Sequence, residues 1–380
     1  MANYRVVSSD NHVHEPPDLW IDRAGPRFKD RVPRLLRDEK TGGDFWWCDS
    51  KSVISLGAGT QTGMRFEEPE KLTTVHTQDE VRLGGYIPEE HLKDMDIDGV
   101  DVSIVYPTVG LLLYSVPDSH LLTEICRTYN DWLAEFCRYN LKRLKGIAML
   151  NVDDVQTGVK ELERCARMGL AGAMITVYPL EERRYFLPEY EPLWAAAENL
   201  GTPLGLHIAT NRPGPGQEFG GPRREGTEST LTPAFICNAD HWIRMSLGDM
   251  IFSGVFERHP KLQVGSVEME LSWAPHFLDR LDYTYTQRTH QKGWFKLTGD
   301  MLPSDYFHRN VFLGFQEDSL GIRMRDIIGV DQLMWGSDYP HVESTWPRSR
   351  QIIEEVLADC TEEERVKIAG GNAARVYNLS

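Results

Sequence analysis

Short apolar runs alternate with longer amphipathic stretches along most of this chain, and the alternation predicts strands followed by helices. The first apolar run lies within residues 6–15. Later runs predict strands over residues 102–106, 145–151, 172–177, 203–208, 262–268, 311–315 and 333–338. Amphipathic stretches predict helices over residues 118–140, 153–168, 192–200, 233–258, 273–290, 318–328, 348–358 and 362–377. Nearly every strand is followed by a helix, which predicts an α/β fold of the (β/α)₈ TIM-barrel type.

An open, doubly wound sheet is the competing architecture. Such sheets often carry a glycine-rich phosphate loop after an early strand, and neither G-x-G-x-x-G nor G-x-x-x-x-G-K-[ST] occurs in this sequence. The barrel is therefore favoured, as one domain over residues 1–380. Residues 16–88 are polar and glycine-rich, and we expect them to form an inserted cap or hairpin region after the first strand. Within them, residues 44–47 and 51–56 could pair as the hairpin.

Composition and charge restrict the classes of partner. The chain is 380 residues long, 41% hydrophobic and 26% charged, which is typical of a soluble globular protein. A formal charge of −16 argues against nucleic acid or an anionic membrane as partner. No apolar run approaches the length of a membrane span, and the chain enters its first strand without a secretory signal.

The cysteines and tryptophans add two weaker indications. Six cysteines lack any C-x-x-C spacing, so we expect reduced thiols in a cytoplasmic protein rather than disulfides or a zinc knuckle. Ten tryptophans hint at a subunit interface, and a homo-oligomer, most simply a dimer, is expected.

Histidines and carboxylates stand where the predicted strands end. His12 and His14 lie two apart on the first strand, so their side chains point to the same side. His207 ends the fifth strand, Glu268 the sixth and Asp338 the eighth. Each alone is more often a hydrogen-bonded core residue, but active sites of barrels lie at these carboxyl ends. Three imidazoles and one carboxylate there suffice for a mononuclear metal site with an open position for water.

The order of these motifs resembles that of the metal-dependent amidohydrolase superfamily, in the branch that contains aminocarboxymuconate-semialdehyde decarboxylase and related aromatic-acid decarboxylases. The likeness covers nearly the whole chain. The motifs that carry it are Asp10-x-His12-x-His14-Glu15-Pro16, Met95-Asp96-x-x-Gly99-Val100-Asp101, His207, Phe256-Glu257-Arg258-His259-Pro260-Lys261-Leu262, Trp335-Gly336-Ser337-Asp338-Tyr339-Pro340-His341 and Gly371-Asn372-Ala373-Ala374-Arg375.

This resemblance implies a ligand set and one point of difference. It implies that His12, His14, His207 and Asp338 bind one divalent ion, usually Zn²⁺, with Mn²⁺ or Fe²⁺ as further possibilities, and that Asp338 can take a proton from metal-bound water. At the sixth strand the decarboxylases commonly carry a histidine in a His-Gly-Gly turn, whereas this chain has Glu268. A carboxylate can act there as a base, as an extra ligand or as a partner that orients a ligand histidine.

Two reaction classes follow for a small-molecule substrate, possibly a carboxylic acid. The first is hydrolysis of an amide, lactone or vinylogous carbonyl compound by metal-activated water, with Asp338 or Glu268 accepting the proton. The alternative is non-oxidative decarboxylation of an aromatic or enol acid. A catalytically silent binding barrel is a third possibility, which an intact ligand set argues against.

Several further side chains are candidates for the substrate pocket. Arg212, Arg223 and Arg65 could hold a substrate carboxylate, although solvated loop charge is the more common role for any one of them. His341 lies just beyond Asp338, and His241 begins a helix near the expected mouth of the barrel. Either histidine could serve as an acid or base, or could make a structural hydrogen bond instead.

Overall fold

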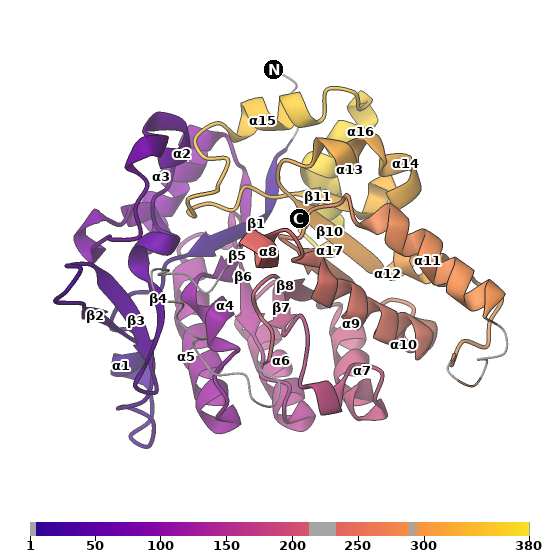
Figure 1. The fold of residues 1–380 in the computed structure, drawn as a ribbon, viewed down its shortest axis with the longest axis horizontal. Helices are drawn as coiled ribbons and strands as arrows, with labels where there is room; N and C mark the ends of the chain where they lie inside the picture. Colours follow the sequence, from indigo (N-terminus) through magenta and orange to yellow (C-terminus); the bar gives the residue numbers. More distant parts are fainter. Residues whose placement is uncertain (1–4, 213–232, 289–292, 294, 380) are drawn as a thin grey trace.

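A computed structural model describes residues 5–212, 233–288, 293 and 295–379 of the chain. Eight parallel strands follow one another around the centre of the molecule in the order β1-β5-β6-β7-β8-β9-β10-β11 (Figure 1). The predicted (β/α)₈ barrel is confirmed. The strands are β1 (Val7–Val13), β5 (Val102–Pro107), β6 (Leu144–Met149), β7 (Gly172–Ile175), β8 (Leu204–His207), β9 (Val264–Val267), β10 (Val311–Phe315) and β11 (Leu333–Trp335).

Backbone hydrogen bonds between the first strand and the segment after the last bring the two ends of the sheet together. The Asp338 N–H donates to the Asp10 carbonyl at 2.8 Å, and the His12 N–H donates to the Tyr339 carbonyl at 2.6 Å. Residues of β1 and residues far along the chain therefore share one end of the barrel. This closure is what places polar residues from both chain ends in one site.

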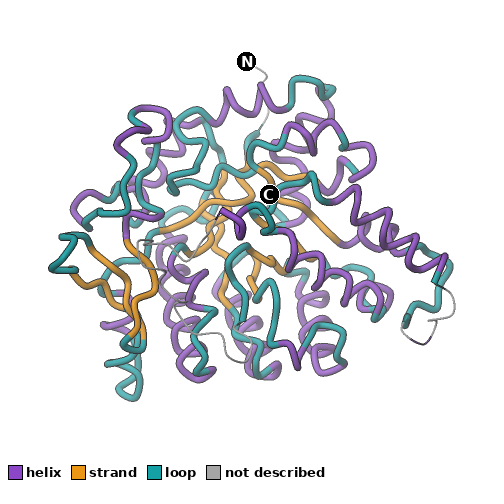
Figure 2. Tube along the Cα trace, viewed as in Figure 1, coloured by secondary structure: helices purple, strands orange, loops and turns teal. Residues whose placement is uncertain are grey.

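The strands are buried along nearly their whole length because helices cover the outer face of the barrel. Figure 2 shows the orange strands in the centre with purple helices around them. The longer surrounding helices are α5 (Ser119–Arg138), α6 (Val155–Met168), α7 (Glu191–Leu200), α9 (Asp240–Phe252) and α11 (Ala274–Gln287). Asp118 and Asp154 cap the first two, each accepting hydrogen bonds from backbone N–H groups of the first turn.

Three predicted helices are interrupted in the structure, and one of them is the stretch 318–328, which forms two short helices, Ser319–Arg323 and Arg325–Ile328. The stretch 233–258 forms α8 (Pro233–Ile236), α9 and α10 (Val255–Arg258), and Gly254, with φ of 76°, separates the last two. The stretch 362–377 forms α16 (Glu362–Val366), a π-helical turn (Lys367–Gly371) and α17 (Asn372–Val376). The remaining helices are α3 (Pro88–Asp98), α4 (Val109–Leu113), α12 (Pro303–Asn310), α13 (Ser319–Arg323), α14 (Arg325–Ile328) and α15 (Ser349–Val356).

The segment between β1 and α3 carries a small antiparallel sheet beside the barrel, at the left of Figure 1. Its strands are β2 (Arg34–Arg37), β3 (Asp44–Cys48) and β4 (Lys51–Ser55), in that order. The runs 44–47 and 51–56 do pair, and β2 adds a strand that the sequence analysis missed. Short helices α1 (Leu19–Arg23) and α2 (Met64–Glu67) flank this sheet in the chain. Trp46 of β3 packs edge-on against Trp20 of α1, with ring centroids 5.6 Å apart.

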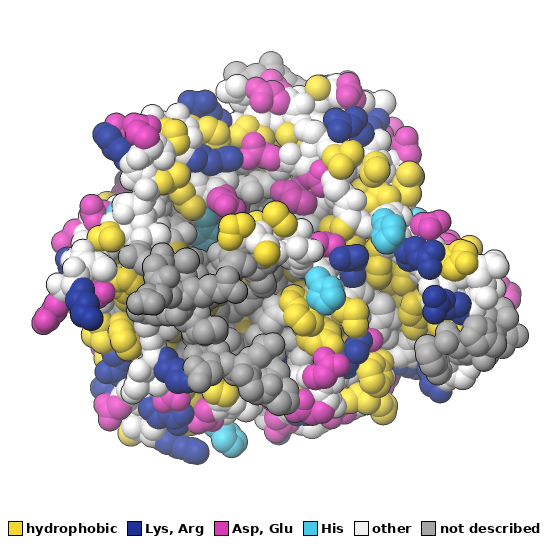
Figure 3. Space-filling model, in the orientation of Figure 1, with side chains coloured by type: hydrophobic (Ala, Val, Ile, Leu, Met, Phe, Trp, Pro, Cys, Tyr) yellow, Lys and Arg dark blue, Asp and Glu magenta, His cyan; other side chains and the backbone are white. Residues whose placement is uncertain are grey.

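The molecular surface shows no single dominant charge on the face seen in Figure 3. Dark blue and magenta side chains are interspersed with hydrophobic ones over the part of this face that is not grey. Among the described helices, none is both long and apolar enough to cross a membrane. The cysteines are free thiols, and of the six only Cys237 is exposed.

Candidate metal centre

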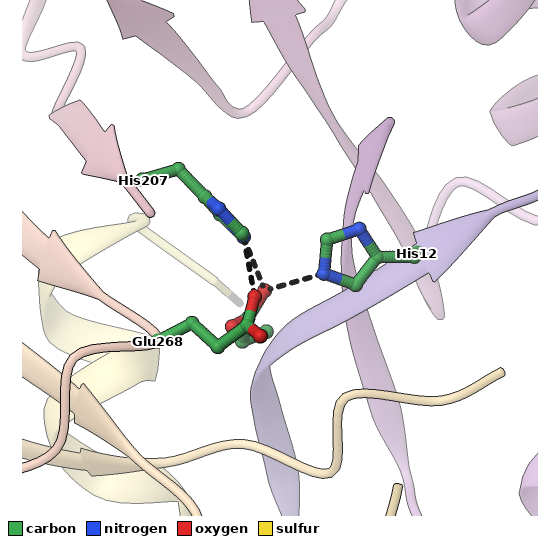
Figure 4. Close-up of side chains that lie close together, drawn as sticks. His12, His207 and Glu268 are labelled. Carbon is green, nitrogen blue, oxygen red and sulfur yellow. Dashed lines mark ion pairs between the residues drawn. The ribbon is translucent and has the colours of Figure 1, made fainter. Parts of the chain in front are cut away.

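Five polar side chains from four strands meet at the carboxyl end of the barrel. Figure 4 shows His12 of β1, His207 of β8 and Glu268, which follows β9, pointing toward one another. His12 Nε2 lies 3.3 Å from Oδ1 of Asp10 and 3.3 Å from Oδ1 of Asp338. His207 Nε2 lies 3.5 Å from Oδ1 of Asp10 and 3.4 Å from Oε2 of Glu268. The predicted gathering of His12, His207, Glu268 and Asp338 is thus present in the geometry.

The two imidazoles are oriented for ligation by backbone carbonyls on their far sides. His12 Nδ1 lies 2.7 Å from the Pro107 carbonyl and His207 Nδ1 lies 3.1 Å from the Ile208 carbonyl. Each Nδ1 therefore carries the proton and donates it, which leaves the Nε2 lone pair facing the centre. This arrangement is the one that metal-ligating histidines adopt.

Three converging atoms at this centre are buried and have no hydrogen-bond partner in the protein. They are Oδ1 of Asp10, Nε2 of His12 and Nε2 of His207. Buried polar atoms are rarely left without a partner, since each costs about 1–3 kcal/mol. Two nitrogen lone pairs and a carboxylate oxygen facing one point repel one another unless a cation lies between them. The donor set therefore fits a divalent ion.

Asp10, to which the sequence analysis gave no role, lies among the possible ligands, whereas His14, which the family resemblance implied as a ligand, lies outside them. Of the groups of possible ligands among the described residues, one holds Asp10, His12, His207 and Glu268, and the other holds His12, Asp338 and His341. His14 belongs to neither group. It follows the last residue of β1, and its N–H donates to the Gly85 carbonyl of the inserted segment instead of to a barrel strand. Residues two apart on a strand point to the same side, so Asp10 faces the same way as His12, just as His14 was expected to. The sequence alone could therefore have identified Asp10 as a candidate ligand.

The carboxylate of Asp338 is held by a short chain of hydrogen bonds. His341 Nδ1 lies 2.7 Å from Oδ1 of Asp338, and His341 Nε2 lies 2.9 Å from Oγ1 of Thr108. The His341 ring also lies against His12, with centroids 4.1 Å apart. Thr108 was not expected at the site. Its position directly after the second barrel strand is the sequence feature that could have identified it as a site residue.

The backbone is left-handed at two of the site carboxylates. Glu268 has φ of 59° and Asp338 has φ of 63°. Residues other than glycine rarely adopt this conformation, and it persists only where the surrounding structure holds it. Here it turns the chain sharply at the strand ends, so that both carboxylates face the centre of the barrel.

Burial dominates the electrostatics of these carboxyl groups. Burial, reinforced by the nearby Asp338 carboxylate, raises the pKa of Glu268 well above its ordinary value. Burial likewise raises the pKa of Asp338, against the opposing effect of His12. Burial also acts to raise the pKa of Asp10, but the imidazoles of His207 and His12 outweigh it and the pKa falls. Buried carboxylates crowded in this way need positive charge nearby, which again fits a cation.

A largely apolar pocket of about 180 Å³ opens above this centre. Its polar floor includes Glu268, Asp338 and His341, and His14 lies in its wall. Apolar wall residues come from the inserted segment and from the loops after the strands. Among them are Trp46, Ile54, Leu56, Val109, Leu111, Leu112, Ile208 and Val342. The pocket has the form of a small-molecule site, with apolar walls and a few converging polar groups.

The structure does not bring the expected arginines into the described wall of this pocket. Arg212 is buried, donates to the Tyr114 and Val116 carbonyls, and pairs with Asp153 at 2.6 Å. Its guanidinium was expected to be available to a substrate carboxylate, but these contacts occupy it. Arg223 lies outside the described residues.

Arg65 and His241 also lie apart from the pocket wall. Arg65 pairs with Glu317 at 2.5 Å and donates to the Ser344 carbonyl. His241 is exposed on α9, with its ring against Trp242. Neither side chain lines the pocket, although the positive charge of Arg65 acts on Asp338 and opposes the rise in the pKa of that carboxyl group.

Comparison with known proteins places the chain in a family. The sequence profile of the amidohydrolase family matches residues 10–379, so the chain belongs to that family and is an enzyme of it. A gamma-resorcylate decarboxylase from Rhizobium sp. (strain MTP-10005) is 27% identical over 315 residues, covering 77% of this chain and 88% of the relative. The decarboxylase branch of the expected superfamily is thereby confirmed.

Solved structures support the fold. An amidohydrolase, map2389c from Mycobacterium avium subsp. paratuberculosis K-10, superposes with a TM-score of 0.76 at 21% identity, covering 99% of this chain and 100% of the other. A 5-carboxyvanillate decarboxylase from Novosphingobium aromaticivorans DSM 12444, complexed with manganese, has a TM-score of 0.68 at 18% identity, covering 99% and 97%. Of the two reaction classes, the similarity to the gamma-resorcylate decarboxylase favours the alternative, decarboxylation, over the hydrolysis that was expected first.

Proposed function

We propose that this enzyme is a divalent-cation-dependent carboxy-lyase that removes CO₂ from an aromatic or enol carboxylic acid without an oxidant. The observation that carries the proposal is the cluster of buried, partnerless donor atoms at the floor of an apolar pocket. The 27% identity to a gamma-resorcylate decarboxylase supports it.

Asp10, His12 and His207 would hold the ion. Asp338 would be the fourth ligand, as the family resemblance implies, since its Oδ1 atom lies 3.3 Å from Nε2 of His12, the residue common to both groups of possible ligands. When bound, the ion would anchor the anionic substrate and stabilise the negative charge that develops during bond cleavage. Zinc suits the two imidazoles, and manganese suits the carboxylate oxygens equally well. Metal analysis of the purified protein distinguishes the two.

The chain's own groups account for the remaining steps. The bond between the ring carbon and the carboxyl carbon breaks, CO₂ departs, and the electron pair left on the ring carbon takes up one proton. Glu268 lies beside the ion site and in the pocket wall, so its carboxyl group can deliver that proton. The apolar walls exclude water, which disfavours the charged carboxylate relative to neutral CO₂. His341 and Thr108 hold Asp338 in position.

Hydrolysis is a second candidate because of one residue. Glu268 is a carboxylate where the resembling decarboxylases commonly carry histidine, and a carboxylate can accept a proton from an attacking water. Both reactions would use a small molecule in a cytoplasmic enzyme, which we expect to be a homo-oligomer, most simply a dimer. We further propose that residues 16–88 act as a cap, because Trp46 and Leu56 line the pocket.

One experiment separates the two reactions. The pure protein is loaded with Mn²⁺ or Zn²⁺ and supplied with hydroxybenzoic acids or with a panel of amides and lactones. We expect CO₂ and the corresponding phenol from the acids, and loss of this activity with a chelator. New carboxylate from an amide or lactone, with no CO₂ from any acid, would instead establish the hydrolase.

A further inference from the structure

His14 is a buried imidazole of the pocket that the metal centre does not use. It is 5% exposed, and its Nε2 atom has no hydrogen-bond partner. It lies in the pocket wall among Leu56, Val109 and Ile208, outside both groups of possible metal ligands. A buried imidazole nitrogen without a partner costs free energy unless something outside the chain bonds to it.

The fold holds this ring in place. The His14 N–H donates to the Gly85 carbonyl at 2.7 Å. A Cβ atom at Gly85 would lie 2.4 Å from Cδ2 of His14, so only glycine admits the imidazole at this position. On the pocket side, the ring neighbours His341, with centroids 6.1 Å apart. The ring is therefore packed from the side of the inserted segment and held in the wall of the pocket.

The residues that line the pocket limit which substrate groups can lie beside His14. The described lining residues include four acidic ones and neither lysine nor arginine. The acidic residues are Glu15, Glu268, Asp338 and Glu343. A second carboxylate on the substrate would find no lysine or arginine partner in the described wall, whereas an uncharged hydroxyl needs none.

We propose that His14 is a specificity-determining residue that hydrogen-bonds an uncharged hydroxyl on the substrate ring, and that the substrate is therefore a hydroxylated aromatic monocarboxylate. The inference rests on the proposed carboxy-lyase function for the carboxylate, which the ion anchors. The hydroxyl then lies at a different ring position, directed toward His14. A second anionic group on the ring would lack a cationic side-chain partner in the described lining.

Binding to the cation-loaded protein tests this inference without requiring turnover. Titration calorimetry compares 2-hydroxybenzoate with the 2,3-, 2,4-, 2,5- and 2,6-dihydroxybenzoates and with the dicarboxylate 4-hydroxyisophthalate. In the wild type, we expect one dihydroxybenzoate to bind about tenfold more tightly than 2-hydroxybenzoate, the effect of one buried hydrogen bond. The dicarboxylate should bind more weakly than either.

Two substitutions isolate the hydrogen bond from the packing. His14→Leu keeps an apolar side chain of similar bulk and should reduce the tenfold preference to within twofold. His14→Gln retains a polar group and should keep part of the preference. Both should keep the wild-type cation content, which also reports that the barrel is folded. The control is His120→Leu, an exposed histidine away from the pocket, which should bind like the wild type.

Each other outcome overturns a definite part of the inference. An unchanged preference in His14→Leu, or no preference in the wild type, removes the role of His14. Loss of the cation in both His14 variants makes His14 a ligand instead. Tight binding of 4-hydroxyisophthalate, or no binding of any acid, refutes the substrate class. Failure of the proposed function looks different, because the acids would then bind with the predicted preference and release no CO₂.

Discussion

The Nε2 atom of His12 lies 3.3 Å from Oδ1 of Asp338, although one residue is on the first barrel strand and the other follows the last. The contact exists because the barrel closes, with the Asp338 N–H bonded to the Asp10 carbonyl. Asp10 shares β1 with His12, and His207 and Glu268 come from the ends of two further strands. The centre is therefore a property of the closed barrel, and local changes in its donors can be tested without dismantling the fold.

Replacing His207 should remove the ion and leave the barrel. His207→Ala deletes one of the two imidazole donors, whose Nε2 atom has no protein partner to lose. We expect the purified variant to retain less than a tenth of the wild-type metal, measured by inductively coupled plasma mass spectrometry, with an unchanged circular dichroism spectrum. Wild-type metal content in this variant would disprove the ligand assignment.

Asp10 should behave as a ligand too. Asp10→Asn keeps the size of the side chain but removes its charge at a point between His12 and His207. We expect metal affinity to fall by about 10- to 100-fold or more, measured by competition with a chromogenic chelator. If the variant binds metal as the wild type does, while a His14 variant does not, the ligand set expected from the family resemblance is the correct one.

The barrel and the polar strand ends could be predicted because they depend on local patterns. Apolar runs buried on both faces mark parallel strands, and a polar residue directly after such a run marks the functional end of the barrel. His12, His207, Glu268 and Asp338 follow from this rule. The interruption of the helix at Gly254 was harder to anticipate, because a glycine is tolerated within many helices.

The roles of Asp10, His14 and Arg212 depended on tertiary contacts that no local pattern contains. Asp10 and His14 flank His12 symmetrically in the sequence. In the structure, Asp10 lies within β1 close to His12 and His207, whereas His14 lies beyond the strand end and its N–H bonds to Gly85. Arg212 follows a barrel strand, as a substrate-binding residue would. Its actual partner, Asp153, stands on another loop, and a sequence does not reveal which two loops meet.

Replacing Glu268 should slow the reaction but should not release the ion, because other side chains also hold the ion. Glu268→Gln keeps the shape of the side chain and removes its ability to give up a proton. We expect CO₂ release to fall about 10²- to 10⁴-fold, the usual contribution of a proton-transferring group, with the metal content retained. Measuring turnover and metal in the same preparation checks both points. Full activity in this variant would assign the proton to another group.

Arg212 should prove to be important for stability rather than for substrate binding. Arg212→Met breaks a buried ion pair with Asp153, and we expect a loss of about 3–5 kcal/mol in the free energy of unfolding, measured by denaturant titration. The matched control is Arg65→Met, whose pair with Glu317 is partly exposed and should contribute about 0–1 kcal/mol. A tenfold rise in KM for a folded Arg212→Met enzyme would instead support the substrate-binding role that was expected from the sequence.

Stability should depend on pH through Asp98, a buried carboxyl of α3. Its oxygens accept hydrogen bonds from the backbone N–H and the hydroxyl of Ser349, but burial is the larger effect and raises its pKa to about 6 from an ordinary value of 3.8. The folded protein therefore holds this proton more tightly than the unfolded chain. The resulting stabilisation is complete below about pH 4 and is lost as the pH rises through 6.

Asp98→Asn tests this linkage without an ionising group: the amide oxygen can accept from the Ser349 N–H, and the amide NH2 group can donate to the Ser349 hydroxyl. The variant should nearly match the wild type near pH 4 and exceed its free energy of unfolding by about 3 kcal/mol at pH 7.5, since the pKa shift is about two units and one unit corresponds to about 1.4 kcal/mol. Denaturant titrations at a series of pH values from 4 to 8 measure the difference. Parallel curves for the two proteins across this range would show that Asp98 ionises in the folded state as readily as in the unfolded one.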